Sequence, residues 1–216
     1  NAPSVVDVPR VKEKNIIRLD ANEVAQLIDN IESGEKLTKQ QKVWHERNKA
    51  RDLAIVVTLL GTGVRVTELV GLDLSDLDFD NGAMRVIRKG GNEDIVYFGE
   101  ETEEMLRNYL DERMKMTPAP GHENALFISQ NNTRITVRSV ERLVKKYAST
   151  ATLKKITPHK LRSTYGTALY QETGDIYLVA DVLGHKNVNT TRKHYAAMKE
   201  ENKRKAANIV QLREKE

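Results

Sequence analysis

The stretch "LAIVVTLLGTGVRVTELVGL", Leu53 to Leu72, decides how the chain can fold. Its apolar first part continues a helical pattern that begins near Lys39, so a helix from about Lys39 to Leu60 should be buried in its second half. The glycines at positions 61 and 63 end this helix, and "VRVTELVGL" predicts a short helix directly after them.

Arg65 stands directly after these glycines, where its neighbours Val64, Val66 and Leu69 should be buried. A charged side chain in such a place is found in folded proteins almost only when it is paired. Glu68, three residues further along the same helix, is one possible partner.

The residues before this stretch divide into an irregular arm and an amphipathic helix. Residues 1–18 carry two prolines and no periodicity, so we interpret residues 1–15 as a linker, or as the arm of a missing upstream domain. In "LDANEVAQLIDNIESG", Asp20 and Glu23 have the spacing of a capping box, and Gly34 marks the end of the helix. Residues 16–216 then form one domain that opens with this helix.

After the short helix the hydrophobic period becomes strand-like. "AMRVIR" and "DIVYF" predict a hairpin with the turn "KGGNE", and "ALFIS" at 125–129 predicts a third short strand. Helices are expected over Glu101–Met116 and Thr136–Ala148, and then in pieces broken at Gly174, Gly184 and around Ala196 to Lys199. The predicted fold class is α+β, mainly α-helical with a small three-stranded antiparallel sheet on one side.

The composition excludes several classes of protein. With 216 residues and 39% hydrophobic residues the chain can bury a real core. It contains no cysteine, which excludes disulfides, thiolate chemistry and the usual structural zinc sites. No run is long and apolar enough to cross a bilayer, so we expect a soluble, cytoplasmic protein without a membrane partner.

The charge is unevenly distributed along the chain. Between residues 66 and 112 there are 13 acidic and 4 basic residues, whereas residues 138–162 hold 8 basic residues and a single acid, Glu141. The second segment should attract polyanions that the first repels, and nucleic acid is its natural partner.

A few polar side chains do not fit the core pattern. They are Arg65, Lys89 at the hairpin tip, His159 and Arg162 on one face at the start of a helix, His185 after Gly184, and Tyr195. Taken singly, each is best explained as a surface, capping or packing residue. His185 and His194 are nine residues apart with no carboxylate between them, which argues against a metal site.

Taken in order, these residues resemble the catalytic signature of the tyrosine recombinases. The resemblance rests on Arg65 in "GTGVRVTELVGL", Lys89 in "RKGGNEDIVYF", His159 and Arg162 in "TPHKLRSTYGTALY", His185 in "LGHKNVNTT" and Tyr195 in "KHYA". It covers about residues 16–210, and the combination is highly specific although each motif alone is weak. It implies the tyrosine recombinase catalytic-domain fold, and it implies that residues 1–15 are a linker or the arm of a missing N-terminal DNA-binding domain.

The resemblance also implies a chemistry. Arg65 and Arg162 would clamp the scissile phosphate, with His185 as a third donor to its non-bridging oxygens. Tyr195 would be the nucleophile and His159 the acceptor of its proton, since a phenol with a pKa of about 10 needs such help. Lys89 would protonate the departing 5′-oxygen and leave a 3′-phosphotyrosine bond. No cofactor, ATP or divalent metal is implied.

Some assignments within this signature stay open. Arg88 could act as the hairpin acid in place of Lys89, because the glycine-rich turn leaves the register uncertain by one. Of the other tyrosines, Tyr165 and Tyr170 fit packing positions, Tyr147 lies on an apolar helical face, and Tyr177 is expected in the core. His194 is interpreted as a bystander.

The family further implies double-stranded DNA as the partner. Contacts mostly to phosphates are expected from Arg138, Arg142, Lys145, Lys146 and Lys160. We expect monomers in solution, a homotetramer on two DNA sites, an excision or host bending factor as a further partner, and a nucleoid-associated location. The amphipathic segment after Tyr195 either folds back on its own domain or docks on a neighbouring subunit.

Several biological roles fit this resemblance. A phage or mobile-element integrase is favoured by the charged tail and the divergent hairpin, with a Xer-type chromosome dimer resolvase as the alternative. A type IB topoisomerase and a catalytically silent DNA-binding module remain as other classes.

Overall fold

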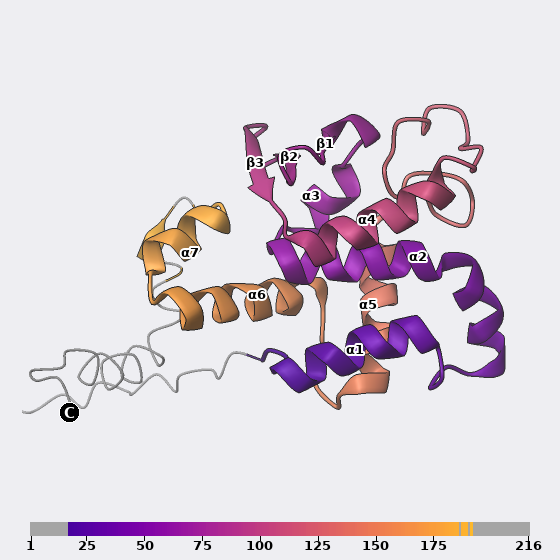
Figure 1. Ribbon diagram of the computed structural model, residues 1–216, viewed down its shortest axis with the longest axis horizontal. Coiled ribbons are helices and arrows are strands. Elements are labelled where there is room, and N and C mark those ends of the chain that lie inside the picture. The colour runs from indigo at the N-terminus through magenta and orange to yellow at the C-terminus, as the bar shows by residue number, and fades with distance from the viewer. Residues whose placement is uncertain (1–16, 186, 190, 192–216) are drawn as a thin grey trace, which may run out of the picture.

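Helices surround one long central helix, and a small sheet lies over one side of them, in a computed structural model that describes residues 17–185, 187–189 and 191 (Figure 1). In chain order the elements are α1 (Ala21–Ser33), α2 (Lys39–Thr62), α3 (Val66–Gly71), the 3₁₀ turn η1 (Leu74–Asp76), β1 (Leu77–Asp78), β2 (Ala83–Ile87), β3 (Glu93–Tyr97), α4 (Glu100–Arg113), α5 (Val137–Ala151), α6 (Pro158–Thr173) and α7 (Ile176–Val182).

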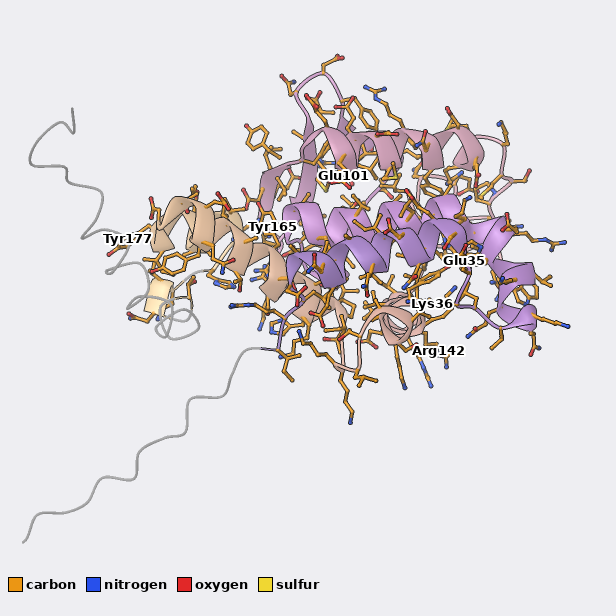
Figure 2. All side chains as sticks on the ribbon, turned by 60° about the horizontal axis from the view of Figure 1, so that its bottom comes forward. Glu35, Lys36, Glu101, Arg142, Tyr165 and Tyr177 are labelled. Atoms are coloured by element: carbon orange, nitrogen blue, oxygen red, sulfur yellow. The ribbon has the colours of Figure 1, made fainter. Side chains whose placement is uncertain are left out.

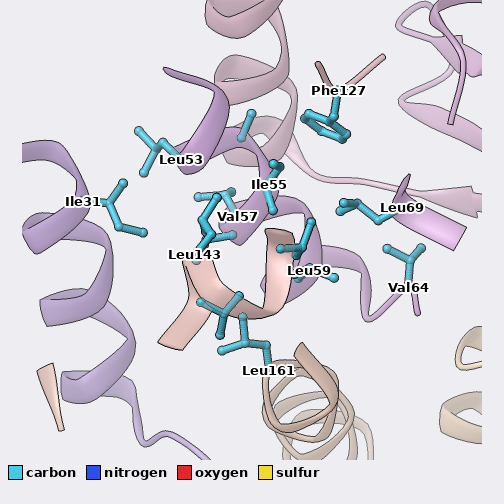
Figure 3. Close-up of a cluster of buried hydrophobic side chains, with 14 of the residues drawn as sticks. Ile31, Leu53, Ile55, Val57, Leu59, Val64, Leu69, Phe127, Leu143 and Leu161 are labelled. Carbon is cyan, nitrogen blue, oxygen red and sulfur yellow. The ribbon is translucent and has the colours of Figure 1, made fainter. Parts of the chain in front are cut away.

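Helix α2 is the centre of the core. Every side chain from Leu53 to Leu59 is buried, which confirms that the second half of this helix lies inside the protein. Helices α1, α4, α5 and α6 all contact it, and Figure 3 shows Leu143 of α5 and Leu161 of α6 beside the buried part of α2. The helix continues two residues beyond its expected end and stops at Gly63, whose φ of 64° is a left-handed conformation that favours glycine.

The start of the described chain agrees with the sequence pattern. Asp20 accepts a hydrogen bond from the backbone N–H of Glu23, and the Glu23 carboxylate accepts one from the backbone of Asp20, both at 2.9 Å. Gly34 ends α1 with a φ of 62°. The capping box predicted from Asp20 and Glu23 is therefore confirmed.

The sheet has three antiparallel strands in the order β1-β2-β3, with Arg85 opposite Ile95. The number of strands is confirmed, but the third strand is β1 rather than residues 125–129. The latter segment makes only isolated bridges, at Ala125 and Ile128. It is buried under α4, where the Tyr109 hydroxyl donates to Leu126 O and accepts from Ile128 N, each at 3.1 Å. Core burial, and not strand pairing, explains its apolar run.

The remaining helices differ from the expected bounds mainly at their ends. Helix α4 covers Glu100–Arg113, so it starts one residue earlier and ends three residues earlier than expected. Helix α5 continues to Ala151. Helix α6 starts at Pro158 and ends at Gly174, as predicted. These three helices and α3 fix the positions of the polar residues considered next.

Candidate active site

A surface pocket of about 480 Å³ lies between the tip of the β2–β3 hairpin and the end of α7. Arg65, Lys89 and His185, three of the residues singled out in the sequence, line it together with Arg88 and Gly184. The remaining lining residues are Asn92, Glu93, Asp94 and Asn187. The pocket thus brings the cations Arg65, Arg88 and Lys89 together with His185, which lies 120 positions after Arg65 in the sequence.

Arg65 is the N-cap residue of α3 and is held by the partner that the sequence suggested. Its Nη1 lies 2.7 Å from Glu68 Oε1, and its backbone N–H donates to Glu68 Oε2, also at 2.7 Å. Its Nη2 donates to Gly184 O at 3.1 Å. About a third of the side chain (32%) remains exposed, so the guanidinium is both fixed in direction and open to the pocket.

Arg162 lies on the buried face of α6, one helical turn after His159. Its Nη1 donates to Gly63 O and its Nη2 to Leu183 O. These carbonyls lie two residues before Arg65 and two residues before His185, so Arg162 joins the two loops that carry the other predicted phosphate ligands. His159 is exposed at the start of α6 and is not among the residues that line the pocket.

His185 follows the end of α7, where Gly184 takes a φ of 58°. Its backbone N–H donates to Ala180 O at 2.9 Å, and its Nδ1 shares a hydrogen bond of 2.7 Å with the hydroxyl of Thr191. The first hydrogen bond holds the backbone of His185, and the second orients its ring beside the pocket. Nothing in the sequence indicated that Thr191 orients His185, and this contact was missed.

The two candidate acids of the hairpin have different surroundings. Arg88 is largely buried (10% of the side chain exposed) and contacts Glu68 at 3.0 Å, Asp94 at 2.9 Å and Val182 O at 3.2 Å. Lys89 is exposed and makes no hydrogen bond or ion pair with any other residue that the structure describes. Arg88 therefore fastens the hairpin to α3 and α7, and Lys89 is the cation of the pair that can move toward a ligand.

The predicted nucleophile Tyr195 and its neighbour His194 lie outside the described residues, as does the segment that follows them. Among the other tyrosines, Tyr147 and Tyr170 are buried. The expectation that Tyr177 lies in the core is wrong: 70% of it is exposed, because α7 turns its other face, with Val179 and Ala180, toward the protein.

The predicted DNA-binding residues fall into two groups. Arg138, Arg142 and Lys145 are exposed on α5, and Lys160 is half-buried in the first turn of α6. Lys146 instead turns inward, with its Nζ 3.4 Å from Asp52 Oδ2 and 3.9 Å from the centroid of the Tyr147 ring. Burial lowers the pKa of Lys146, although the charge of Asp52 opposes this shift. Lys146 is therefore a partly buried side chain paired with Asp52, unlike the exposed cations of α5.

Neither a membrane segment nor a metal cluster was found in the part of the chain that the structure describes. None of the described helices is long and apolar enough to span a bilayer. The described residues also contain no group of three or more histidine, aspartate or glutamate side chains placed to hold a metal ion.

The sequence of the chain is similar to those of known proteins. The model of the Phage integrase family matches residues 17–202. The chain belongs to this family. Its relatives include the tyrosine recombinase XerC of Corynebacterium glutamicum, 41% identical over 148 residues, which are 68% of this chain and 47% of the relative. The tyrosine recombinase XerS of Streptococcus agalactiae is 38% identical over 184 residues, 84% of this chain and 51% of the relative.

Solved structures show the same fold for this member of the Phage integrase family. The XerA recombinase superposes with a TM-score of 0.72 at 31% identity, covering 88% of this chain and 65% of that one. The Tn1549 transposon integrase, solved in complex with circular intermediate DNA, gives 0.65 at 25% identity, with 89% and 67% covered. The chain spans about half the length of the curated relatives it matches.

Proposed function

We propose that this chain is the catalytic part of a site-specific DNA recombinase that cuts and rejoins strands through a covalent 3′-phosphotyrosine. The observation that carries the proposal is the convergence of Arg65, Lys89 and His185 on one pocket, with Arg162 bound to the loops on both sides of it. The family of the chain and the solved DNA complexes of relatives support the same conclusion.

Each step of the proposed reaction is assigned to named residues. The Tyr195 oxygen attacks the phosphorus, and its proton passes to His159. Charge then builds on the non-bridging oxygens of the five-coordinate phosphate, where the guanidiniums of Arg65 and Arg162 and the ring of His185 donate to it. The bond to the 5′-oxygen breaks, and Lys89 supplies the proton that this oxygen takes up. Rejoining runs the same steps backward, with a 5′-hydroxyl as the nucleophile.

A suicide substrate, nicked next to the cleavage point, tests the nucleophile. The chain should form a covalent adduct at the 3′ side of the break, and Tyr195→Phe should bind the same duplex without forming one. An adduct that persists in Tyr195→Phe would overturn the assignment. The adduct should also form in EDTA, since no metal takes part in the steps above.

The proton donor is tested with a substrate that carries sulfur in place of the departing 5′-oxygen. A thiolate leaves without a proton, so Lys89→Ala should be slow on the normal substrate and recover on the sulfur substrate. Arg88→Ala should not recover in this way, because Arg88 acts through its contacts with Glu68 and Asp94. The opposite pattern would move the acid to Arg88.

Assembly is a further part of the proposal. We expect monomers in solution and a tetramer on two DNA sites, which sedimentation with and without DNA would detect. For the biological role we favour integration and excision of a mobile element. Resolution of chromosome dimers is the second candidate, because the XerC and XerS relatives are recombinases of the Xer group.

A further inference from the structure

A second pocket, of about 410 Å³, lies between α2 and α5, apart from the candidate active site. It has the size of ordinary ligand pockets, and no residue singled out for catalysis lines it. Its walls come from three parts of the chain. They are α2 with Trp44, Arg51 and Asp52, the turn at Ser129–Asn131, and α5 with Arg142 and Lys146.

The charge of this pocket favours an anion. Three cations line it, Arg51, Arg142 and Lys146, against one carboxylate, Asp52. Asp52 is only 2% exposed, and its Oδ1 accepts from Arg51 Nη2 at 2.7 Å. Arg51 is thereby neutralised, while Lys146 lies at 3.4 Å from the same carboxylate, and the side chain of Arg142 makes no hydrogen bond or ion pair with any other described residue. A positive charge is left facing the opening.

The pocket also offers neutral donors and one aromatic ring. Gln130 and Asn131 are exposed, and their side-chain amides make no hydrogen bond within the described part of the chain. Trp44, the only tryptophan of the protein, is 47% exposed. A large ring beside a guanidinium and free amides suits a ligand with a charged group and an adjoining carbon ring, such as a phosphate and its deoxyribose.

The position of the pocket points to the source of that phosphate. Arg142 lines the pocket and also belongs to the exposed row of α5 that includes Arg138 and Lys145. Figure 2 shows Arg142 at the outer edge of α5, on the side where Lys36 reaches that helix with a hydrogen bond of 3.1 Å to Thr150 O. A duplex that lies along this row would carry its backbone past the mouth of the pocket.

We infer that the α2–α5 pocket is a second DNA contact, in which one backbone phosphate and its deoxyribose of the bound duplex sit between Arg142, Asn131 and Trp44. The inference rests on the proposed function in that DNA is the ligand, but it concerns a contact away from the cleaved phosphate. It extends the DNA-binding surface to α2, a helix that was not expected to contact DNA.

The single tryptophan provides a direct test, because its emission reports on this pocket and nowhere else. A labelled duplex of arbitrary sequence, titrated at low salt, should change the Trp44 emission with the same midpoint as the anisotropy of the label. Binding seen in the anisotropy without a change in emission would overturn the pocket and leave the proposed function intact. Loss of binding in both would overturn the proposed function as well. Inorganic phosphate is the control ligand, and a response to phosphate alone would show a free-anion site and overturn the DNA assignment.

Matched variants sharpen the test. Asn131→Asp places a carboxylate in the pocket without changing the size of the side chain, and should weaken duplex binding by about tenfold at low salt. Asn108→Asp makes the same change on the exposed surface of α4 and should alter binding by less than about twofold. Arg142→Gln should lower the slope of log affinity against log salt by about one, and Lys115→Gln should not. Equal effects of Asn131→Asp and Asn108→Asp would overturn the inference.

Discussion

Glu68 and Asp52 are buried carboxylates that each pair with two cationic side chains, but their structural roles differ. Glu68 holds Arg65 and Arg88, which come from α3 and the hairpin, and Arg65 still opens onto the pocket. Asp52 gathers Arg51, the Tyr147 hydroxyl at 3.0 Å and Lys146, and almost nothing of it reaches the surface. The first carboxylate directs donors toward a ligand, and the second joins α2 to α5.

The buried Asp52 also affects the pKa of the Tyr147 hydroxyl. Burial, and then the neighbouring negative charge of Asp52, raise the pKa of its hydroxyl well above the usual value. The hydroxyl therefore stays protonated at neutral pH and donates to Asp52. A tyrosine in this position serves packing and hydrogen bonding, which leaves Tyr195 as the proposed nucleophile.

Removing the second carboxylate should have the largest effect on stability. Asp52→Ala leaves Arg51 and Lys146 without their partner in a buried site, and we expect a loss of about 3 kcal/mol in the free energy of unfolding. Thermal melting should show a midpoint lower by roughly 6–12 °C. Asp94→Asn, which removes an exposed partner of Arg88, is the control and should cost less than about 1 kcal/mol. Similar losses in both variants would contradict the distinction.

Neutralising the first carboxylate should instead reduce the rate of cleavage. In Glu68→Gln the guanidinium of Arg65 loses the charge that fixes its direction, and we expect adduct formation at saturating DNA to slow by about tenfold or more. The measurement is made well below the melting midpoint, where the variant is fully folded. Asp52→Asn, measured alongside, should keep the normal rate in its folded fraction. A normal rate in Glu68→Gln would show that Glu68 is only structural.

A smaller effect is expected where α1 meets the α5–α6 connection. Partial burial opposes ionisation of Glu23, but hydrogen bonds from Lys154 and Thr152 outweigh it and lower the pKa of Glu23 to about 2. Ionised Glu23 thus adds stability above its unfolded-state pKa, and this is lost as the pH falls toward about 2. The difference in melting midpoint between the protein and Glu23→Gln should shrink as the pH is lowered from 6 to 3. A constant difference would contradict this. The pair is partly exposed, so the contribution should stay below about 1 kcal/mol.

Some structural features of these regions can be predicted from the sequence, and others cannot. The burial of Leu53–Leu59 and the pairing of Arg65 with Glu68 follow from local pattern, and both are confirmed. The apolar run at 125–129 could not be told from a strand, because burial against α4 and strand pairing select the same residue types. Lys146 looked like any basic residue of α5, since nothing local indicates that Asp52, 94 positions earlier, lies beside it.

The role of Arg88 shows the same limit in the candidate active site. The sequence raised it only as a rival to Lys89, because residues one apart in a glycine-rich hairpin cannot be ordered by pattern. Its contacts with Glu68 and Val182 O come from distant segments and appear only in the folded chain. The side chain is so close to Gly184 that a Cβ added there would lie 2.8 Å from Arg88 Cζ. A side chain at this position would therefore have to shift the Arg88 guanidinium, in addition to adopting a φ of 58°.

The backbone carbonyls of Gly63, Leu183 and Gly184 have a consequence for how the proposed DNA substrate would bind. In the structure they accept hydrogen bonds from the guanidiniums of Arg65 and Arg162. A carbonyl oxygen carries only a partial charge, so in the proposed reaction a phosphate would be a stronger acceptor than these carbonyls for the same N–H groups. The guanidiniums would thus be held in place before the phosphate arrives, and exchange of a neutral acceptor for an anion would favour binding.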